Sequence, residues 1–336
     1  MLEPSELSAW IFQYGERSIV TTLVTGGAGF VGANLCERLV ADGETVIALD
    51  NFVTGRRSNL AALEGNPAFS LVDFDLNTGL PALPKLDRIY HFASPASPPE
   101  YQRFPIETLL VNAEGTRRLL DRAVEDGAWF LFASTSEVYG DPLDHPQRED
   151  YRGHVSSIGP RSMYDESKRY AEALITAYAE RYGMHTRMVR IFNTYGPHMA
   201  PHDGRVVSNF IVQALQGEPL TIYGSGQQTR SFQYIDDLIE GVVRLMKSHY
   251  SGPVNIGNPN EFTMLELATK VLSMTGSPSE IDFLPLPVDD PNRRRPDITL
   301  AKTLLGWEPR VSLDEGLEKT IGYYRSVVLG ETGVAG

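Results

Sequence analysis

The stretch that decides the fold is Thr25-Gly-Gly-Ala-Gly-Phe-Val-Gly32, near the start of this 336-residue chain. An apolar, β-branched run over residues 19–24 precedes it and predicts a buried strand. A helix is expected after it, and then a second strand over residues 45–49 that ends at Asp50. Spaced glycines keep a turn tight and let the backbone approach a pyrophosphate at the helix N-terminus. The succession of strand, glycines, helix, strand and acid therefore predicts a dinucleotide site.

Asp50 also indicates which dinucleotide binds. At the end of the second strand its carboxylate can accept a hydrogen bond from an adenosine ribose hydroxyl. A 2′-phosphate would be repelled there, so the sequence favours NAD over NADP. Arg56 and Arg57 follow closely, either as a solvated face or as contacts to the cofactor's phosphates. Asp75 could meet the adenine edge, although an ordinary loop acid is an equal explanation.

Strands and helices continue to alternate along the chain. Further strands are expected at residues 68–72, 88–93, 129–135 and 185–191, and helices at 105–126 and 161–182. This alternation predicts an α/β fold with a doubly wound, mainly parallel Rossmann-type sheet. After Asn193, short segments rich in glycine and proline predict a smaller C-terminal substrate-binding lobe, and one more sheet strand is expected at 253–257.

The same pattern divides the chain into parts. We expect an N-terminal extension over residues 1–18, helical from Ser5, which lacks the basic start of a signal peptide. The NAD-binding domain is expected over residues 19–192 plus about 232–258. The substrate-binding lobe is expected over 193–231 plus about 259–326, with the substrate in the cleft between the two.

Composition restricts the partners. The net charge of −13 argues against nucleic acid or an anionic membrane as partner. No run approaches the roughly 18 apolar residues of a membrane span. Cys36 is the single cysteine, so an intrachain disulfide is excluded, a cytoplasmic location is expected, and the thiol itself is interpreted as a buried apolar group. No metal site is predicted.

Tyr164 and Lys168 lie four residues apart, which places them on one face of the predicted helix. A tyrosine has a reference pKa of about 10, too high for a base at neutral pH. The ammonium of Lys168 and a positive nicotinamide would both lower it. Ser136 or Thr135, at a strand end, can hydrogen-bond the same substrate hydroxyl. Each residue alone has a structural explanation, but together with the dinucleotide turn they predict a redox site with Tyr164 as proton acceptor.

The order Thr-Gly-x-x-Gly-x-x-Gly, Ser/Thr and Tyr-x-x-x-Lys resembles the extended short-chain dehydrogenase/reductases that act on nucleotide sugars. Longer strings resemble the UDP-glucuronic acid decarboxylases (UDP-xylose synthases), over residues 19 to about 325. These strings are Asp50-Asn-Phe-Val-Thr-Gly55, His91-Phe-Ala-Ser-Pro-Ala-Ser-Pro-Pro99, Ser134-Thr-Ser-Glu-Val-Tyr-Gly-Asp-Pro142, Arg190-Ile-Phe-Asn-Thr-Tyr-Gly-Pro197, Asp203-Gly-Arg-Val-Val-Ser-Asn-Phe210, Tyr223-Gly-Ser-Gly-Gln-Gln-Thr-Arg230 and Asp289-Asp-Pro-Asn-Arg-Arg-Arg-Pro-Asp297.

The resemblance implies an NAD-dependent carboxy-lyase. In that family, bound NAD oxidises C4 of UDP-glucuronate, the 4-keto acid loses CO2, and C4 is reduced again to give UDP-xylose. A carboxylate β to a ketone leaves readily because the ketone takes up the electrons as an enolate. A homodimer, formed through helices at 105–126 and 161–182, is also implied by the resemblance.

Alternative functions remain open at this point. They are a decarboxylase that releases the UDP-4-keto-pentose, a 4-epimerase, a 4,6-dehydratase, and a non-enzymatic NAD sensor or scaffold. The 4,6-dehydratases carry Thr-Asp-Glu after strand five, and here Ser136 replaces that acid. The 4-epimerases usually lack an acid at the third place, where this chain has Glu137. Intact Tyr164 and Lys168 argue against a non-enzyme.

The resemblance also assigns residues to roles. The catalytic set is Tyr164, Lys168, Ser136, Thr135, Glu137 and Arg294. The cofactor set is Gly26, Gly29, Phe30, Val31, Gly32, Asp50, Asn51, Phe52, Thr54, Gly55, Asp75, Leu76, Phe92, Ser94, Tyr164 and Lys168. The UDP-sugar set is Pro98, Tyr101, Asn193, Arg205, Val207, Tyr223, Arg230, Gln233 and Arg294.

Glu137 and Arg294 are assigned to the C5–C6 end of the sugar, with Arg294 near the lost carboxyl or the diphosphate. A carboxylate that caps a strand-end turn is the structural alternative for Glu137. Arg293 and Arg295 are as well explained by solvation. Two departures from the family pattern are Leu110-Val111, where a Lys-Thr pair is frequent, and His198, where an arginine is common.

Overall fold

The computed structural model describes residues 19–285 and 293–330, so the expected N-terminal extension and its helix lie outside the described residues. Seven parallel strands form the central sheet, in the order β11-β6-β5-β4-β1-β2-β3. Their bounds are β1 Thr21–Thr25, β2 Thr45–Asp50, β3 Phe69–Asp73, β4 Arg88–His91, β5 Trp129–Thr135, β6 Thr186–Ile191 and β11 Pro253–Ile256. All seven strands fall where the sequence predicts them, and the predicted fold class is confirmed.

The strand order reverses direction between β1 and β4. β1 pairs with β2 on one side and with β4 on the other, so the chain builds the sheet outward in both directions from this point. The loops that leave the carboxyl ends of β1 and β4 part here, and in doubly wound sheets ligands bind in that crevice. The glycine turn follows β1, and the proline-rich loop follows β4.

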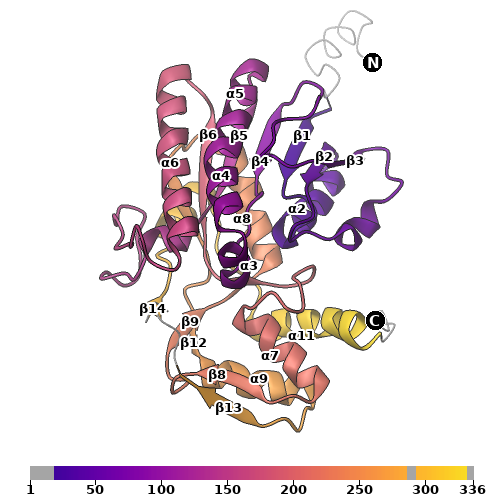
Figure 1. Cartoon of the computed structure of the whole chain (residues 1–336), viewed down its shortest axis with the longest axis vertical. Helices are drawn as coiled ribbons and strands as arrows, with labels where there is room; N and C mark the ends of the chain where they lie inside the picture. Colours follow the sequence, from indigo (N-terminus) through magenta and orange to yellow (C-terminus); the bar gives the residue numbers. More distant parts are fainter. Residues whose placement is uncertain (1–18, 286–292, 331–336) are drawn as a thin grey trace, which may run out of the picture.

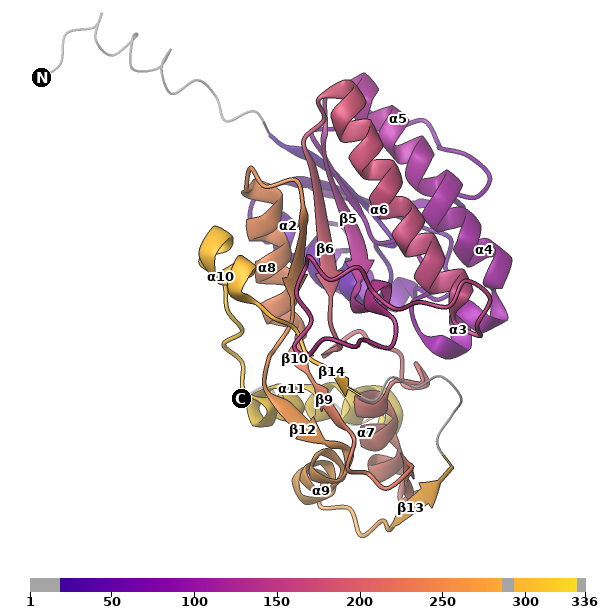
Figure 2. The same ribbon diagram turned by 90° about the vertical axis from the view of Figure 1, so that its left-hand side faces the viewer.

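Helices cover both faces of the sheet, as Figure 2 shows. On one side lie α2 Phe30–Ala41, α8 Ile235–Lys247 and α10 Thr299–Leu305, and on the other α4 Pro105–Leu110, α5 Thr116–Asp126 and α6 Ser162–Tyr182. Successive strand residues divide between two cores: Leu23 packs with the α5–α6 side and Val24 with the α2–α8 side. Both faces of the inner strands are therefore buried, which explains their continuous apolar runs, whereas the edge strand β3 is partly exposed.

The predicted helix over 105–126 is interrupted. The structure has α4, a π-helical turn at Val111–Gly115, and then α5. Asn112 stands in the widened turn, fully buried, and its amide donates to the hydroxyls of Ser94 (3.0 Å) and Ser167 (3.1 Å). The π turn thus ties the loop after β4 to the helix that carries Tyr164.

The remaining elements gather below the carboxyl ends of the strands in Figure 1. They are α3 Pro98–Arg103, β7 Thr194–Tyr195, α7 Val206–Gln216, β8 Leu220–Tyr223, β9 Thr229–Ser231, β10 Gln233–Tyr234, β12 Glu261–Thr263, α9 Met264–Thr275, β13 Ile281–Leu284, β14 Arg293–Arg294 and α11 Leu313–Tyr324. The chain leaves the sheet after β6, returns for α8 and β11, leaves again, and returns once more for α10 before α11. The domain boundaries given above stay a prediction. Within the described residues, no helix has both the length and the apolar character needed to cross a bilayer.

Candidate active site

The glycine turn after β1 is too tight for side chains at two positions. Gly26 has a left-handed φ of 70°, and a Cβ there would lie 2.8 Å from the backbone nitrogen of Ala93. A Cβ on Gly32 would lie 2.0 Å from the carbonyl oxygen of Gly26. Gly29 caps the N-terminus of α2. The turn therefore offers bare backbone at a helix N-terminus, which suits a pyrophosphate.

Asp50 ends β2 beside this turn and is buried. Its carboxylate accepts from the backbone N–H groups of Ala28 (2.9 Å) and Phe52 (2.8 Å). Burial raises the pKa of Asp50, and these two donors oppose that rise. A Cβ on Gly55 would reach the same carboxylate at 2.8 Å, so Gly55 leaves room for it.

A pocket of about 100 Å³ lies against Asp50 and the turn. It is lined by predicted cofactor residues, namely Gly26, Gly29, Asp50, Asn51, Thr54, Asp75, Leu76, Phe92 and Ser94. Of the other predicted cofactor residues, Val31 lines the larger cavity described next, and Phe52 packs under the guanidinium of Arg57 at 4.1 Å. Phe30 lies 5.8 Å from the guanidinium of Arg205. A small pocket beside a buried carboxylate fits the adenosine end of a dinucleotide.

A cavity of about 600 Å³ lies between the sheet and the lower elements. Predicted residues that line it are Pro98, Tyr101, Thr135, Ser136, Glu137, Tyr164, Asn193, Arg205, Val207, Tyr223, Arg230 and Arg294. Gln233 lies elsewhere: its side chain is fully buried and donates to Thr194 (2.9 Å) and to the carbonyl of Ile256 (3.0 Å). The assignment of Gln233 to the substrate is thus corrected to a structural role.

Tyr164 is buried at the edge of this cavity, with its ring stacked on Tyr101 at 5.1 Å between centroids. Burial raises the pKa of its phenol, and the charge of Glu137 adds to that rise, while a hydrogen bond with Thr135 and the charge of Arg205 oppose it. In the protein alone the phenol pKa therefore lies above its ordinary value, whereas the predicted lowering includes the charge of a bound nicotinamide and stays a prediction.

Lys168 explains part of this difference. Its ammonium is buried, donates to the carbonyl of Ala133 at 2.9 Å, and lies 4.6 Å over the ring of Phe132. Burial lowers the pKa of Lys168 to about 7, so only part of the population is charged at neutral pH. Lys168 cannot then offset the burial of the phenol by itself, and a positively charged ligand would have to supply the rest.

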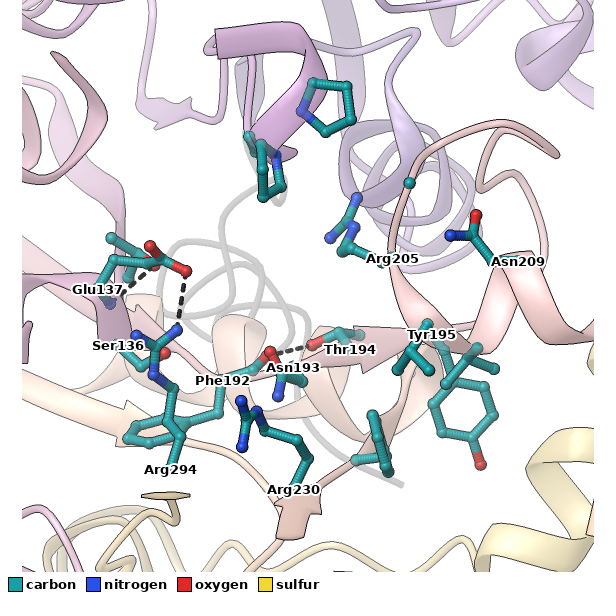
Figure 3. A pocket seen from close by; sticks show the side chains of 18 of the residues that line it. Ser136, Glu137, Phe192, Asn193, Thr194, Tyr195, Arg205, Asn209, Arg230 and Arg294 are labelled. Carbon is teal, nitrogen blue, oxygen red and sulfur yellow. Dashed lines mark hydrogen bonds and ion pairs between the residues drawn. The ribbon is translucent and has the colours of Figure 1, made fainter. Parts of the chain in front are cut away.

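Glu137 points into the cavity, and Figure 3 shows its contact with Arg294. A second arginine, Arg161, also binds its carboxylate. Glu137 accepts from Arg294 at 2.8 Å and from the Nε and Nη2 of Arg161 at 3.0 and 2.7 Å. Burial alone would raise the pKa of Glu137, but the charges of Arg294 and Arg161 outweigh it and bring the pKa to about 2. The strand-end turn is capped instead by Thr135, whose hydroxyl accepts from the N–H of Glu137. The capping alternative for Glu137 is thereby replaced by an ionised carboxylate between two cations.

Asp165 completes this cluster. It is buried, and its side chain is hydrogen-bonded to Glu137. Burial and then the charge of Glu137 raise its pKa to about 8, so the carboxyl is neutral at pH 7. Two guanidinium groups, Arg161 and Arg294, thus face the ionised carboxylate of Glu137. The cluster is suited to an anionic group of a ligand.

Sequence reasoning missed Arg161 and Asp165. Both flank Tyr164 at the start of α6, and their spacing of four residues places them on one helix face. That spacing is the signal that could have found them. The contact with Glu137, 24 residues earlier, is visible only in the folded chain.

Further arginines face the cavity. Arg230 of β9 stands opposite Arg294 of β14 in the parallel pairing, and Figure 3 shows both side chains directed into the cavity. Arg205 lies across from them and pairs with Asp203 at 2.8 Å. A protein with a net charge of −13 thus gathers guanidinium groups here. The planar guanidinium fork binds phosphate groups well.

The two departures from the family pattern, Leu110-Val111 and His198, lie in different parts of the structure. Val111 lines the small pocket, whereas Leu110 is exposed. The side chain of His198 reaches Glu37 at 3.2 Å, and its carbonyl accepts from Arg56 at 3.1 Å. Arg56 is therefore a structural clamp. Arg57 forms an exposed ion pair with Asp73.

Among the residues the structure describes, no group of three or more His, Cys, Asp or Glu could hold a metal ion.

Comparison with known proteins agrees with this geometry. The model of the NAD dependent epimerase/dehydratase family matches residues 22–257. UDP-glucuronic acid decarboxylase 1 of Danio rerio is 56% identical over 309 residues, covering 92% of this chain and 73% of the relative. UDP-glucuronic acid decarboxylase 6 of Arabidopsis thaliana is 50% identical, covering 90% of this chain and 88% of the relative.

Solved structures give the same fold. The UDP-glucose 4-epimerase of Thermotoga maritima, with UDP-glucose, has a TM-score of 0.84 at 30% identity, covering 92% of this chain and all of that one. The UDP-glucuronic acid 4-epimerase of Bacillus cereus, with UDP-glucuronic acid and NAD, has a TM-score of 0.82 at 29% identity and the same coverage. The chain belongs to the NAD dependent epimerase/dehydratase family, and within it to the UDP-glucuronic acid decarboxylases.

Proposed function

We propose that this protein decarboxylates UDP-glucuronate to UDP-xylose through a 4-keto intermediate. The observation that carries the proposal is the ionised Glu137 between Arg161 and Arg294, in the cavity that also holds Tyr164. The cluster provides two guanidinium groups for a uronate, and Tyr164 provides a phenol for the C4 hydroxyl. Identity of 56% to a UDP-glucuronic acid decarboxylase over 92% of the chain supports the same reaction.

The residues divide the work between two ends of the sugar. NAD, when bound, accepts a hydride from C4 and later returns it. Tyr164 takes the proton of the C4 hydroxyl and gives it back after decarboxylation, with Thr135 orienting the oxygen. Between these steps the ketone takes up the electron pair of the C5–C6 bond as CO2 leaves, and a proton then adds at C5. The sum is one proton taken up and one CO2 released.

Glu137 and Arg294 are proposed to act at the C5–C6 end, and Arg161 keeps Glu137 in place. Arg205 and Arg230 are proposed to bind the diphosphate from opposite sides of the cavity. Asp50 is proposed to bind the adenosine ribose of NAD. The other cofactor and substrate residues keep the roles that the resemblance assigns, except for Gln233.

Incubation with UDP-glucuronate and analysis of the product masses tests the proposal. We expect UDP-xylose and one CO2 per substrate consumed. A product of unchanged mass and no CO2 would instead indicate a 4-epimerase. A product lighter than UDP-xylose by two hydrogens would indicate release of the UDP-4-keto-pentose.

We also propose that the protein forms a homodimer. α4 exposes Ile106, Leu109 and Leu110 at 65, 41 and 42% of their surfaces, and it packs beside α6, which exposes Tyr170 and Tyr182 by about half. An apolar surface on two neighbouring helices is typical of an interface between subunits. Light scattering should give twice the chain mass, and Ile106→Glu should give a monomer; a wild-type monomer would contradict the proposal.

A cytoplasmic location is proposed as well. Cys36 is the one cysteine of the sequence, it lies buried in α2, and burial raises the pKa of its thiol. Such a protein gains nothing from an oxidising compartment. Fractionation of the source cells tests this, and recovery with a membrane or secreted fraction would contradict it.

A further inference from the structure

The pair of Glu137 and Arg294 is carried by two short segments. Glu137 lies in the 3₁₀ turn Ser136–Tyr139, and Arg294 ends the two-residue strand β14. The residues are 157 positions apart in the chain, and their side chains meet at 2.8 Å. Segments this short cannot fix the position of a guanidinium by themselves, so other residues must hold them.

Gln147 holds the segment that follows Arg294. It is fully buried in the connection between β5 and α6. Its N–H donates to the carbonyl of Arg295 (2.9 Å), and its side-chain oxygen accepts from the N–H of Arg295 (2.9 Å). The backbone carbonyl of Gln147 accepts from the N–H of Asp297 (2.8 Å). Its side-chain amide nitrogen donates to the backbone carbonyl of Asp144 (2.8 Å). Main chain and side chain together form a clamp directly after Arg294.

Asn255 joins this clamp to the turn that carries Glu137. It lies fully buried in β11, and its amide nitrogen donates to the carbonyls of Gln147 and Asp297, each at 3.1 Å. Its side-chain oxygen accepts from the hydroxyl of Tyr139 at 2.7 Å, and Tyr139 is the last residue of the turn with Glu137. The segment that carries Glu137 and the segment that carries Arg294 are thus both hydrogen-bonded to Asn255 in the edge strand β11.

We propose that Gln147 is a positioning residue that sets the guanidinium of Arg294 for the uronate end of the substrate, an inference that rests on the proposed function. Gln147 acts through Arg294, because both polar atoms of its side chain are engaged with backbone atoms of Asp144 and Arg295. A loosened segment would let Arg294 move, and a misplacement of about 1 Å can cost roughly 100-fold in rate. The effect should be confined to ligands that carry a C6 carboxylate.

Ligand binding to the NAD-loaded protein tests this, in a Tyr164→Phe background that prevents turnover. Gln147→Met removes the side-chain acceptor and donor at similar size. We expect about tenfold weaker binding of UDP-glucuronate and unchanged binding of UDP-glucose, measured by calorimetry. In an Arg294→Ala background, Gln147→Met should have no further effect, because both changes remove the same contact.

Gln213→Met is the matched control. The side-chain oxygen of Gln213 accepts from the backbone N–H of Thr221 (3.1 Å), and its amide nitrogen donates to the hydroxyl of Thr221 (3.0 Å). Gln213→Met should weaken the two ligands alike. The inference would be overturned if Gln147→Met weakened the binding of UDP-glucuronate and UDP-glucose equally. It would also be overturned if the loss of affinity from Gln147→Met added fully to that from Arg294→Ala.

Two further measurements keep the inference separate from folding and from the proposed function. If Gln147→Met does not fold, Gln147→Asn carries the same test, because its amide is one methylene too short to reach Arg295. With Tyr164 intact, Gln147→Met should slow CO2 release about tenfold or more at saturating substrate. Absence of CO2 release from the wild type would contradict the proposed function, whereas an unaltered preference for the uronate would contradict the role of Gln147.

Discussion

Tyr164 is the residue on which the proposed chemistry depends most. Tyr164→Phe keeps the ring that stacks on Tyr101 but removes the phenolic oxygen. We expect turnover to fall by roughly 100-fold or more, as for loss of a general base, while UDP binding stays nearly unchanged. Steady-state rates and calorimetry with UDP measure the two effects. Near-normal turnover would assign the base to another residue.

Glu137 belongs to the other half of the cycle. Glu137→Gln keeps the shape but leaves Arg161 and Arg294 without their carboxylate. We expect slower CO2 release with C4 oxidation maintained, so reduced cofactor should accumulate after mixing with UDP-glucuronate and be visible by its absorbance. If the variant binds substrate but forms no reduced cofactor, Glu137 serves oxidation and the proposed division of labour is wrong.

Asp165 gives the protein a pH-dependent stability. Its carboxyl has a pKa raised to about 8 by burial and by Glu137. Between about pH 4 and pH 8 the unfolded carboxyl is ionised while the folded one keeps its proton, so folded-state stability falls as pH rises and then levels off. Asp165→Asn stays neutral and can still donate to Glu137.

We therefore expect the melting temperature of Asp165→Asn, relative to the wild type, to rise by several degrees between pH 5 and pH 8. Calorimetric scans across this range measure it. Glu137 and Arg161, which face Asp165, keep their charges throughout, because the pKa of Glu137 is lowered to about 2 and that of Arg161 is raised. A difference that does not change with pH would mean that Asp165 is ionised in the fold.

Single residues also show where sequence reasoning reached its limit. The roles of Glu137 and Arg294 followed from resemblance, and the structure brings the two side chains together. The contact of Arg161 with Glu137 could not be predicted, because it depends on how α6 sits against the end of β5. The raised pKa of the Tyr164 phenol in the protein alone was not predicted, because burial, which dominates it, has no signature in a Tyr-x-x-x-Lys pattern.

Among the elements, the glycine turn after β1 tolerates side chains least, because a Cβ at Gly26 or Gly32 would clash with backbone atoms. Gly32→Ala would place a methyl group 2.0 Å from the carbonyl oxygen of Gly26, so the turn must open. We expect about tenfold or greater loss of NAD binding and a lower melting temperature, since overpacking of this kind costs roughly 1–3 kcal/mol.

The matched control is Gly322→Ala in α11, where a Cβ would meet no atom within 4 Å. It should be neutral or slightly stabilising, because alanine favours a helix. Retention of NAD can be assayed by denaturing each purified variant and measuring the released nucleotide. Normal NAD content in Gly32→Ala would show that the turn does not bind the pyrophosphate as proposed.

Most of the sheet strands were predictable because they are buried on both faces and read as apolar runs. The edge strand β3 is the exception to this burial, since Ser70 and Asp73 are exposed. The π-helical turn at Val111–Gly115 was not predictable, since the sequence there continues a helical pattern. What widens the helix is a tertiary contact, the bonds from Asn112 to Ser94 and Ser167. Local pattern thus determined the type of each long element, and packing determined its irregularities.

At the scale of the whole molecule, the sequence predicted a sheet and a separate group of short elements after β6. The cavity between them was expected, but its contents were only partly foreseen. Gln233 was predicted to reach the substrate, yet β10 turns it into the interior. Gln147 in a connecting segment and Asn255 in β11 were not singled out from the sequence, because a single buried amide belongs to no motif. The positions of these side chains depend on contacts between segments that are far apart in the sequence.

In the proposed reaction, one bound NAD removes and returns the same hydride, and CO2 is lost between the two steps. Mass analysis of the product from UDP-glucuronate labelled with deuterium at C4 tests it most directly. The proposed reaction predicts UDP-xylose, lighter by CO2, that keeps the deuterium at C4. A product that retains the full mass of the substrate, or a pentose product that has lost the deuterium, would contradict it.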